Sequence, residues 1–483
     1  MIMRRNIVLF LAVVLAAAVP ARAKVTLPAV FSDNMVLQQG ASAPVWGTAQ
    51  PGARVKLTAS WNGVTLATRA DDNGRWRMDV ATPAAGGPYR ITVSDGEKLV
   101  LENVMIGEVW LCSGQSNMEM PFVGWGKPDG WEREIAEADH PSIRLLHVEH
   151  ATAAQPQDDV KVRGGGWQVC SPASVPEFSA TAYFFGRELA ESLGVPVGLI
   201  HSSWGGTDIE PWIEGGCLRM IPEFVAKADE VQATEAGVKV SPHSCTALYN
   251  AMIAPIVPYG IRGAIWYQGE NNVSRAWQYR DLFPLLIASW RQQWGTDFPF
   301  YFVQLTAFKP QLPEPGESEW AELREAQTRT LAVENTGMAV IIDKGSATDI
   351  HPKDKLTVGR RLALLARART YGEEIPCSGP MYRSHRIAGN EIAIAFDCTD
   401  GGLRTSDGGA PTGFAVAGCD HRFHWAEARI EGGCVVVGSP QVPFPIAVRY
   451  GWADNPECNL CNGAGLPASP FRTDDWKGCT RKD

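Results

Sequence analysis

Two features are missing from this sequence of 483 residues: a long hydrophobic run beyond residue 19 and a surplus of basic side chains. Without such a run, no membrane-spanning helix is expected in the rest of the chain. The chain has 44 Lys and Arg against 53 Asp and Glu, a formal net charge of −9, and this acidic balance argues against a nucleic-acid partner. Internal repeats and low-complexity tracts are also absent, so nothing points to a repeat architecture.

The one hydrophobic run lies near the start of the chain. Arg4 and Arg5 precede the apolar residues 7–19, and the small residues Ala21 and Ala23 follow. The run is too short to span a bilayer comfortably, and Ala-x-Ala is a pattern typical of signal-peptide cleavage. The sequence therefore predicts a signal peptide at 1–23, export to the periplasm or the extracellular space, and no membrane span after cleavage. Removing the three arginines of this segment lowers the formal charge from −9 to −12.

Eleven cysteines leave at least one thiol unpaired. A chain of this size buries a full core without disulfides, so the bonds are compatible with export but not required. Cys419 and Cys434 flank a strand-like stretch and are candidates for a bridge, whereas Cys112 is expected to be a buried thiol. Cys458-x-x-Cys461 has the spacing of half a zinc ribbon, but no second pair follows it. We therefore expect no structural zinc.

The pattern of apolar residues changes twice along the mature chain and predicts three regions. Residues 24–103 carry short alternating segments between glycine-containing turns, typical of a small antiparallel β domain. Residues 104–375 alternate apolar strands with helical segments, which indicates a parallel sheet covered by helices on both faces. Residues 376–483 return to a β pattern. The expected fold class is α/β: a three-layer α/β/α domain with flanking small β-sandwich-like domains. Within the central region we expect strands at 104–111, 197–200, 263–267, 300–305 and 339–343, and helical segments at 182–192, 247–253, 279–294, 320–334 and 355–371.

The most informative motif is Gly-Gln-Ser-Asn-Met at 114–118, directly after the apolar strand predicted at 104–111. A turn at a strand end exposes Ser116, which needs a base to become a nucleophile. The turn lacks the second glycine of a G-x-S-x-G elbow, so it argues against the α/β-hydrolase fold. A helix N-cap is the alternative role for this serine.

A candidate base follows in Asp349-Ile350-His351-Pro352. Proline restricts the residue before it to extended conformations, so Asp349 and His351 project to the same side. A carboxylate on one imidazole nitrogen fixes the tautomer and stabilises the imidazolium that forms when the other nitrogen takes the serine proton. Alternatively, Asp349 caps the following helix or turn, and Asp343 or Glu270 serves as the acid.

Two further strand ends carry candidate oxyanion donors. The pair Gly205 and Gly206 follows the strand at 197–200 and lets backbone N–H groups approach a substrate oxygen. Gln268, after the strand at 263–267, offers a side-chain amide, and Glu270 is expected to orient this loop. Ligands bind at the carboxyl ends of the strands in such sheets, so all these loops are expected to meet.

As a set, these motifs resemble the sialate O-acetylesterase family of the SGNH-hydrolase type. The similarity rests on GQSNM at 114–118, SWGGT at 203–207, WYQGE at 266–270, DIHP at 349–352, LREAQ at 323–327 and GLPASPFR at 465–472. It implies an SGNH-hydrolase-like catalytic domain in which Ser116 is the nucleophile, His351 the base and Asp349 its orienting acid. The implied oxyanion hole is formed by Ser116, by Gly205 or Gly206, and by Gln268 in place of the asparagine that names these enzymes. Gln115, Asn117 and Glu270 are expected to support it.

The resemblance implies a serine esterase that removes O-acetyl groups from sialic acids through an acetyl-enzyme, with no metal or cofactor. Trp204 and Tyr267 are candidates for contact with a pyranose ring, although such residues more often fill a core. Arg324 is suited to a bidentate contact with a sialic carboxylate, or else it fastens its helix to the catalytic loops. Two alternatives stay open: an acetylxylan or other polysaccharide acetylesterase, and a non-catalytic carbohydrate-binding protein with a degenerate hydrolase core.

Overall fold

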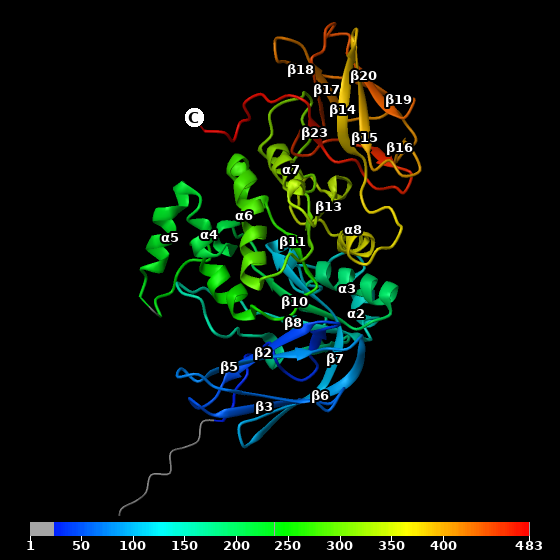
Figure 1. The fold of residues 1–483 in the computed structure, drawn as a ribbon. Coiled ribbons are helices and arrows are strands. Elements are labelled where there is room, and N and C mark those ends of the chain that lie inside the picture. Colours follow the sequence, from blue (N-terminus) through cyan, green and yellow to red (C-terminus); the bar gives the residue numbers. More distant parts are fainter. Residues whose placement is uncertain (1–23, 236, 483) are drawn as a thin grey trace, which may run out of the picture.

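The computed structural model describes residues 24–235 and 237–482, so the predicted signal peptide lies outside the described residues. Three regions follow one another along the molecule (Figure 1): an N-terminal β region, a central region of mixed strands and helices, and a C-terminal β region. The two β regions lie at opposite ends, with the central region between them. No described helix is long and apolar enough to cross a membrane.

The N-terminal β region is mostly antiparallel, apart from a parallel pair of strands, and several of its strands alternate between core and solvent. β2 (Ser42–Thr48) pairs with β5 (Arg75–Ala81), which is buried at every second residue. A second sheet contains β1 (Val36–Gln38), β3 (Arg54–Ala59), β4 (Thr65–Arg69), β6 (Gly86–Ser94) and β7 (Lys98–Gly114). The parallel pair is β1 with β7. β7 is 17 residues long and continues into the central sheet, so the boundary predicted at 103/104 falls inside one strand.

The central sheet has the strand order β13-β12-β11-β7-β10-β8-β9. Its strands besides β7 are β8 (His140–His147), β9 (Gln168–Cys170), β10 (Val197–Ser203), β11 (Gly263–Tyr267), β12 (Phe300–Val303) and β13 (Thr336–Ala339). All neighbouring pairs are parallel except the β8–β9 pair at the edge. A parallel sheet places the carboxyl ends of its strands on one edge, where ligands are bound in such folds.

Helices cover both faces of this sheet, as the alternating pattern predicts. α3 (Ala180–Leu193) and α8 (Lys355–Leu365) pack on the face that receives Trp110 and Cys112 of β7. α6 (Ala276–Trp294) packs on the opposite face, and α7 (Glu319–Arg329) lies beside it. Shorter helices complete the region: α1 (Ser116–Glu119), α2 (Trp131–Ala136), α4 (Gly215–Leu218) and α5 (Val225–Gln232). The three-layer α/β/α fold is confirmed.

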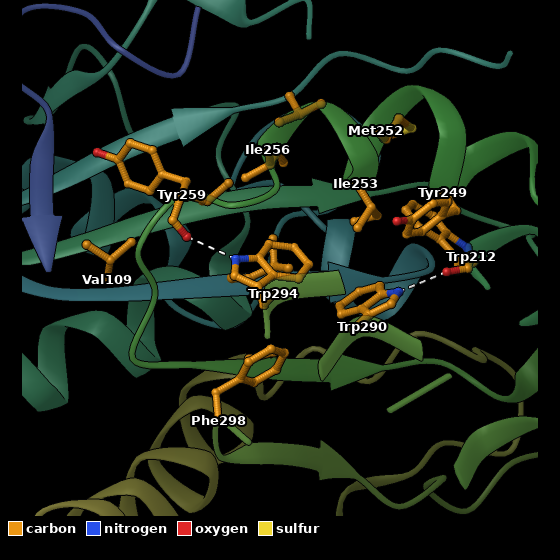
Figure 2. Packing of buried hydrophobic residues seen from close by; sticks show 14 of the residues in the cluster. Val109, Trp212, Tyr249, Met252, Ile253, Ile256, Tyr259, Trp290, Trp294 and Phe298 are labelled. Atoms are coloured by element: carbon orange, nitrogen blue, oxygen red, sulfur yellow. Dashed lines mark hydrogen bonds between the residues drawn. The ribbon is translucent and has the colours of Figure 1, made fainter. Parts of the chain in front are cut away.

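Large aromatic side chains fill the core beneath α6 (Figure 2). The indole N–H groups of Trp290 and Trp294 donate to the carbonyl oxygens of Trp212 and Tyr259, at 2.9 Å in both cases. Both indole N–H groups are therefore paired in the core. An unpaired buried N–H would offset part of the free energy gained by burying the ring. Truncating such a tryptophan to alanine costs about 3–5 kcal/mol.

The C-terminal β region contains two four-stranded antiparallel sheets around a separate core. One sheet is formed by β14 (Met381–Ala388), β15 (Glu391–Asp397), β20 (Cys434–Gly438) and β19 (Glu427–Glu431). The other is formed by β18 (Phe423–Trp425), β17 (Phe414–Ala417), β21 (Ala447–Tyr450) and β23 (Phe471–Arg472). β16 (Leu403–Thr405) pairs with β22 (Leu460–Asn462) beside them.

Three expectations about this architecture were wrong or incomplete. The strand expected at 339–343 lies earlier, at β13, and residues Ile342–Lys344 form a 3-10 turn instead. The helix expected at 355–371 ends as α8 at Leu365 and continues as a π-helical turn, Ala366–Thr370. All eleven cysteines are free thiols in the structure, including the candidate pair Cys419 and Cys434. Cys112 is fully buried, as predicted.

Candidate active site

The loops predicted to carry chemistry meet at the carboxyl edge of the central sheet. Gly114, the last residue of β7, is in register with Ser203 of β10 and with Tyr267 of β11. The segments that follow these three strands therefore start side by side, although more than 150 residues separate the first from the third.

Ser116 is the first residue of α1, immediately after β7. Gly114 has a φ of +140°, and a Cβ built on it would lie 2.2 Å from the carbonyl oxygen of Tyr267, so only glycine allows β7 to end this close to β11. The side chain of Ser116 is partly exposed, in contrast to its buried neighbours Gln115 and Asn117. The first N–H groups of a helix have no acceptor within that helix, so the backbone N–H of Ser116 is free to face a ligand.

His351 lies against this serine. Its Nε2 is 2.9 Å from Ser116 Oγ, and its Nδ1 is 3.3 Å from Asp349 Oδ1. The same carboxylate oxygen accepts the backbone N–H of His351 at 2.8 Å. Trp125 meets the imidazole ring edge to face, with ring centroids 5.4 Å apart. The structure thus brings together the serine, histidine and aspartate that the sequence predicts.

The other candidate acids have different partners. Asp343 forms a two-point ion pair with Arg361, at 2.5 and 2.8 Å. Glu270 is buried and accepts a hydrogen bond from Asn117. Of the three carboxylates considered from the sequence, Asp349 is the one that faces the imidazole.

The environment of His351 favours its neutral form. Burial lowers the pKa of His351, the nearby ammonium of Lys355 lowers it further, and Asp349 only partly opposes them. Burial acts to raise the pKa of Asp349, but the hydrogen bond from the His351 backbone and the charge of Lys353 outweigh it and hold that pKa below its usual value. At neutral pH the pair is therefore a neutral imidazole beside a carboxylate, which is the state of a general base with its orienting acid.

A buried polar network lies behind the serine and the histidine. The Asn117 amide donates to Glu270 Oε1 at 2.6 Å and to the carbonyl oxygen of Ile350 at 3.1 Å. The ammonium of Lys355 donates to Asn117 Oδ1 at 2.6 Å. Asn117 thereby ties the turn that carries Ser116 to the loop after β11 and to the residue before His351, as expected of a supporting residue.

Lys355 is a functional candidate that the sequence analysis missed. It is fully buried, and burial lowers its pKa to about 7 in spite of the attraction of Glu270. Burial correspondingly raises the pKa of Glu270, whose second carboxylate oxygen has no hydrogen-bond partner in the described chain. A buried lysine is rare. The available signal in the sequence was that Lys355 lies only four residues after His351, at the start of the predicted helix.

Gly205 lies against the serine, as an oxyanion donor requires. A Cβ built on it would be 3.1 Å from the Cβ of Ser116, so the glycine permits this close approach. Its N–H donates to Oε2 of Glu119 at 2.5 Å, and Oε1 of the same carboxylate is 3.0 Å from Nε2 of His150. Gly206 is exposed, with open space around its Cα.

Gln268 does not present a free amide to the site. Its Nε2 donates to the carbonyl oxygen of Thr207 at 3.1 Å and to Asn272 Oδ1 at 2.7 Å, which uses both amide hydrogens. Its Oε1 accepts the hydroxyl of Tyr279. Gln268 therefore holds the loops after β10 and β11 together in this arrangement. Gln115 links loops in the same way: its Oε1 accepts the N–H of Gly269 at 3.3 Å, which joins the turn after β7 to the loop after β11.

Two of the three residues expected to contact substrate are buried. Tyr267 is fully buried in the core beneath the site. Arg324 is also fully buried, and it donates to four backbone carbonyl oxygens, those of Leu305, Thr306, Ala453 and Asp454. Arg324 therefore fastens α7 to the segment after β12 and to residues 453–454, and not to the catalytic loops, as the alternative had it. The structure does not support the predicted contact with a substrate carboxylate. Trp204 is partly exposed and stacks on His150, with ring centroids 4.3 Å apart.

Within the described residues, no group of three or more His, Cys, Asp and Glu side chains is placed to hold a metal ion.

A three-layer parallel sheet with a serine, a histidine and a carboxylate at its carboxyl edge, and without a G-x-S-x-G elbow, is the architecture of SGNH-type ester hydrolases. The comparisons with known proteins agree with this class. The sequence model of the family described as "Carbohydrate esterase, sialic acid-specific acetylesterase" matches residues 106–366. The chain belongs to this family, and it is a carboxylic ester hydrolase.

Full-length relatives support the assignment. The chain is 30% identical to the sialate O-acetylesterase of Homo sapiens over 91% of both proteins, and 29% identical to that of Mus musculus over 91% of this chain and 93% of the relative. The crystal structure of a carbohydrate acetylesterase from Xanthomonas citri superimposes with a TM-score of 0.85 at 40% identity, covering 94% of this chain and 100% of that one.

Proposed function

We propose that this protein hydrolyses O-acetyl esters of sialic acids, with Ser116 as nucleophile, His351 as general base and Asp349 as the acid that orients it. The observation that carries the proposal is the 2.9 Å separation between Ser116 Oγ and His351 Nε2, with Asp349 on the other imidazole nitrogen. This arrangement fulfils the geometric requirement for proton transfer from a nucleophile to a base.

The reaction proceeds in two halves. Ser116 Oγ attacks the acetyl carbonyl carbon while His351 Nε2 takes its proton, and the bond from that carbon to the sugar oxygen then breaks. The sugar oxygen receives the proton from His351 and leaves as a hydroxyl, and the acetyl group stays on Ser116. Water repeats the same steps on the acetyl-enzyme and releases acetate. Asp349 stabilises the imidazolium in each half.

Backbone donors stabilise the negative charge on the carbonyl oxygen. The N–H of Ser116 at the start of α1 is one such donor, and the N–H of Gly205 or Gly206 is the second. For Gly205 to serve, the substrate oxygen displaces the Glu119 carboxylate that accepts its N–H in this structure. Gln268 then acts indirectly, through its hydrogen bond to Thr207 next to this glycine pair.

The named relatives support sialic acid as the substrate, because the curated full-length proteins are sialate O-acetylesterases. A second candidate is the O-acetyl ester of a neutral polysaccharide such as acetylxylan. Two observations favour it: the buried guanidinium of Arg324 is not available to a sialic carboxylate, and the relative with the higher identity is a carbohydrate acetylesterase.

Acetate release tests both parts of the proposal. Ser116→Ala and His351→Ala are each expected to reduce hydrolysis of an aryl acetate by several orders of magnitude, because the residues act as one unit. Ser192→Ala, on the exposed end of α3, is the matched control and should retain full activity. Near-normal turnover by either active-site variant would rule out the triad. Faster acetate release from acetylated xylan than from 9-O-acetylated sialic acid would instead favour the neutral polysaccharide as substrate.

We also infer that the protein is exported, as the charged start, apolar run and Ala-x-Ala pattern of residues 1–23 indicate. Sequencing of the mature N-terminus is expected to give Lys24. An unprocessed chain in the cytoplasm would contradict the inference.

A further inference from the structure

A cavity of about 650 Å³ lies between the loop at 311–317, which connects β12 to α7, and the C-terminal β region. None of the active-site residues named above lines it. Its volume lies within the range of about 300–1,000 Å³ that is typical of small-molecule sites. The rest of the lining comes from residues 410–414, 425–428, 452–453 and 455–457.

The walls of this cavity are fixed before any ligand binds. At one end of the loop the Lys309 ammonium is 2.7 Å from Asp454, and at the other end the Ser318 hydroxyl donates to the same carboxylate at 2.5 Å. The indole N–H of Trp425 donates to the carbonyl oxygen of Pro313 at 2.8 Å, which holds the middle of the loop against β18. A preformed cavity avoids the entropic cost of ordering a loop on binding.

The lining combines aromatic side chains with carboxylates. Trp425 and Leu312 line the cavity and are 44% and 59% exposed, and Trp452 contributes a second indole. Every charged residue of the lining is a glutamate: Glu314, Glu317, Glu427 and Glu457. Of these, Glu317 is paired with the buried Arg449, at 2.9 Å.

We propose that this cavity is a binding site for a neutral oligosaccharide, separate from the catalytic centre. A pyranose ring has apolar C–H faces that pack on an indole and a rim of hydroxyls that donate to carboxylates, which matches the two kinds of group in the lining. Apart from Glu317, whose charge Arg449 offsets, the exposed Glu314, Glu427 and Glu457 have no cation beside them in the lining and repel a negatively charged sugar. The site therefore selects against sialic acids and accepts neutral glycan chains.

Isothermal titration calorimetry tests the proposal with xylohexaose, cellohexaose and maltohexaose as neutral probes and sialyllactose as the anionic probe. None of these probes carries an O-acetyl ester, so the unmodified protein is used and turnover does not interfere. At least one neutral probe is expected to bind, and sialyllactose is expected to bind at least about tenfold more weakly. Failure of all neutral probes to bind at millimolar concentration, or tighter binding of sialyllactose, would overturn the proposal.

Variants of Trp425 locate the site. Trp425→Ala is expected to weaken neutral-probe binding by about tenfold or more, which corresponds to about 1.4 kcal/mol. Trp425→Phe keeps an aromatic face and should lose only about threefold. Phe444→Ala, which removes another exposed aromatic ring of the C-terminal β region, is the matched control and should leave binding unchanged. Unchanged binding in Trp425→Ala would refute this location.

The result does not depend on the catalytic proposal, because binding is measured without turnover. Trp425→Ala should hydrolyse an aryl acetate at the rate of the unmodified protein, which also shows that the variant is folded. A parallel loss of this hydrolysis would mean that the cavity and the catalytic centre are one site, and it would contradict the separation proposed here.

Discussion

Arg324 offers a quantitative test of how the central and C-terminal regions are joined. The sequence leaves open whether its guanidinium binds a substrate carboxylate or fastens α7, and the structure places it out of solvent with four hydrogen bonds to backbone carbonyl oxygens at 2.7–2.8 Å. Two of these oxygens belong to Ala453 and Asp454 in the C-terminal β region. The perturbation that removes the contacts and keeps the apolar bulk is Arg324→Met.

The size of the effect follows from these bonds. Hydrogen bonds to a charged group contribute about 1.5–3 kcal/mol each, so the gross loss for four bonds is large. The variant also removes the cost of burying a guanidinium, which is several kcal/mol and offsets part of this loss. The carbonyl oxygens of Thr306 and Asp454 keep a donor, from Trp320 and Phe308, but those of Leu305 and Ala453 lose theirs. We therefore expect a net destabilisation of about 3–5 kcal/mol. The entropy of unfolding is about 2.1 cal/mol/K per residue, so this loss lowers Tm by about 3–5 °C if the whole chain unfolds as one unit.

Thermal unfolding followed by circular dichroism measures the shift. Arg329→Met is the matched control, because Arg329 lies on the same helix, is exposed, and has one ion pair with Glu325 at 3.3 Å. Such a surface pair is worth at most about 1 kcal/mol. Below its Tm, Arg324→Met should keep the KM of the unmodified protein for 9-O-acetylated sialic acid. An unchanged Tm together with a raised KM for this substrate, but not for an aryl acetate, would refute the structural role.

Three further outcomes are expected. Asp349→Asn should lower kcat about a hundredfold or more while the fold is retained, since the tautomer of His351 is no longer fixed; full activity would mean that another acid orients the imidazole. Lys355→Met should move the acidic limb of the kcat/KM profile to higher pH, because the active base is neutral and losing the ammonium raises the pKa of His351, whereas Lys355→Arg should leave the limb in place. Identical profiles for the two Lys355 variants would exclude this charge effect. Gly205→Ala should lower kcat at least about tenfold, since its Cβ comes within 3.1 Å of Ser116 and displaces a reacting group by a few tenths of an ångström; unchanged turnover would place the oxyanion elsewhere.

Much of the site could be predicted because the loops that follow parallel strands meet at one edge of the sheet. β11 was expected at its observed limits, because a fully apolar run followed by polar residues is typical of a buried parallel strand. Once such strands are placed, Ser116 and the Gly205 loop must lie on one edge of the sheet. The proline after His351 predicts the extended geometry that lets Asp349 reach the imidazole, and the 3.3 Å contact agrees with it.

Hydrogen-bond partners could not be predicted from the sequence. The roles of Gln268 and Arg324 depend on which acceptors the folded chain presents to them. Apart from Asn272 Oδ1, those acceptors are backbone carbonyl oxygens, which leave no pattern in the sequence. Lys355 was missed because lysine is ordinarily exposed, so its place at the start of a helix gives no direct sign of burial. The expected strand at 339–343 was wrong because Ile341 and Ile342 are buried in a turn, and an apolar run alone does not distinguish these two situations.

Covalent labelling tests the central claim most directly. An organophosphate ester that mimics the acyl group should modify the protein once, and peptide mass spectrometry should place the modification on Ser116. His351→Ala should lose this labelling, because the hydroxyl is a poor nucleophile without its base. Labelling of a different residue, or no labelling in a protein that still hydrolyses acetate esters, would contradict the assignment of Ser116 and His351.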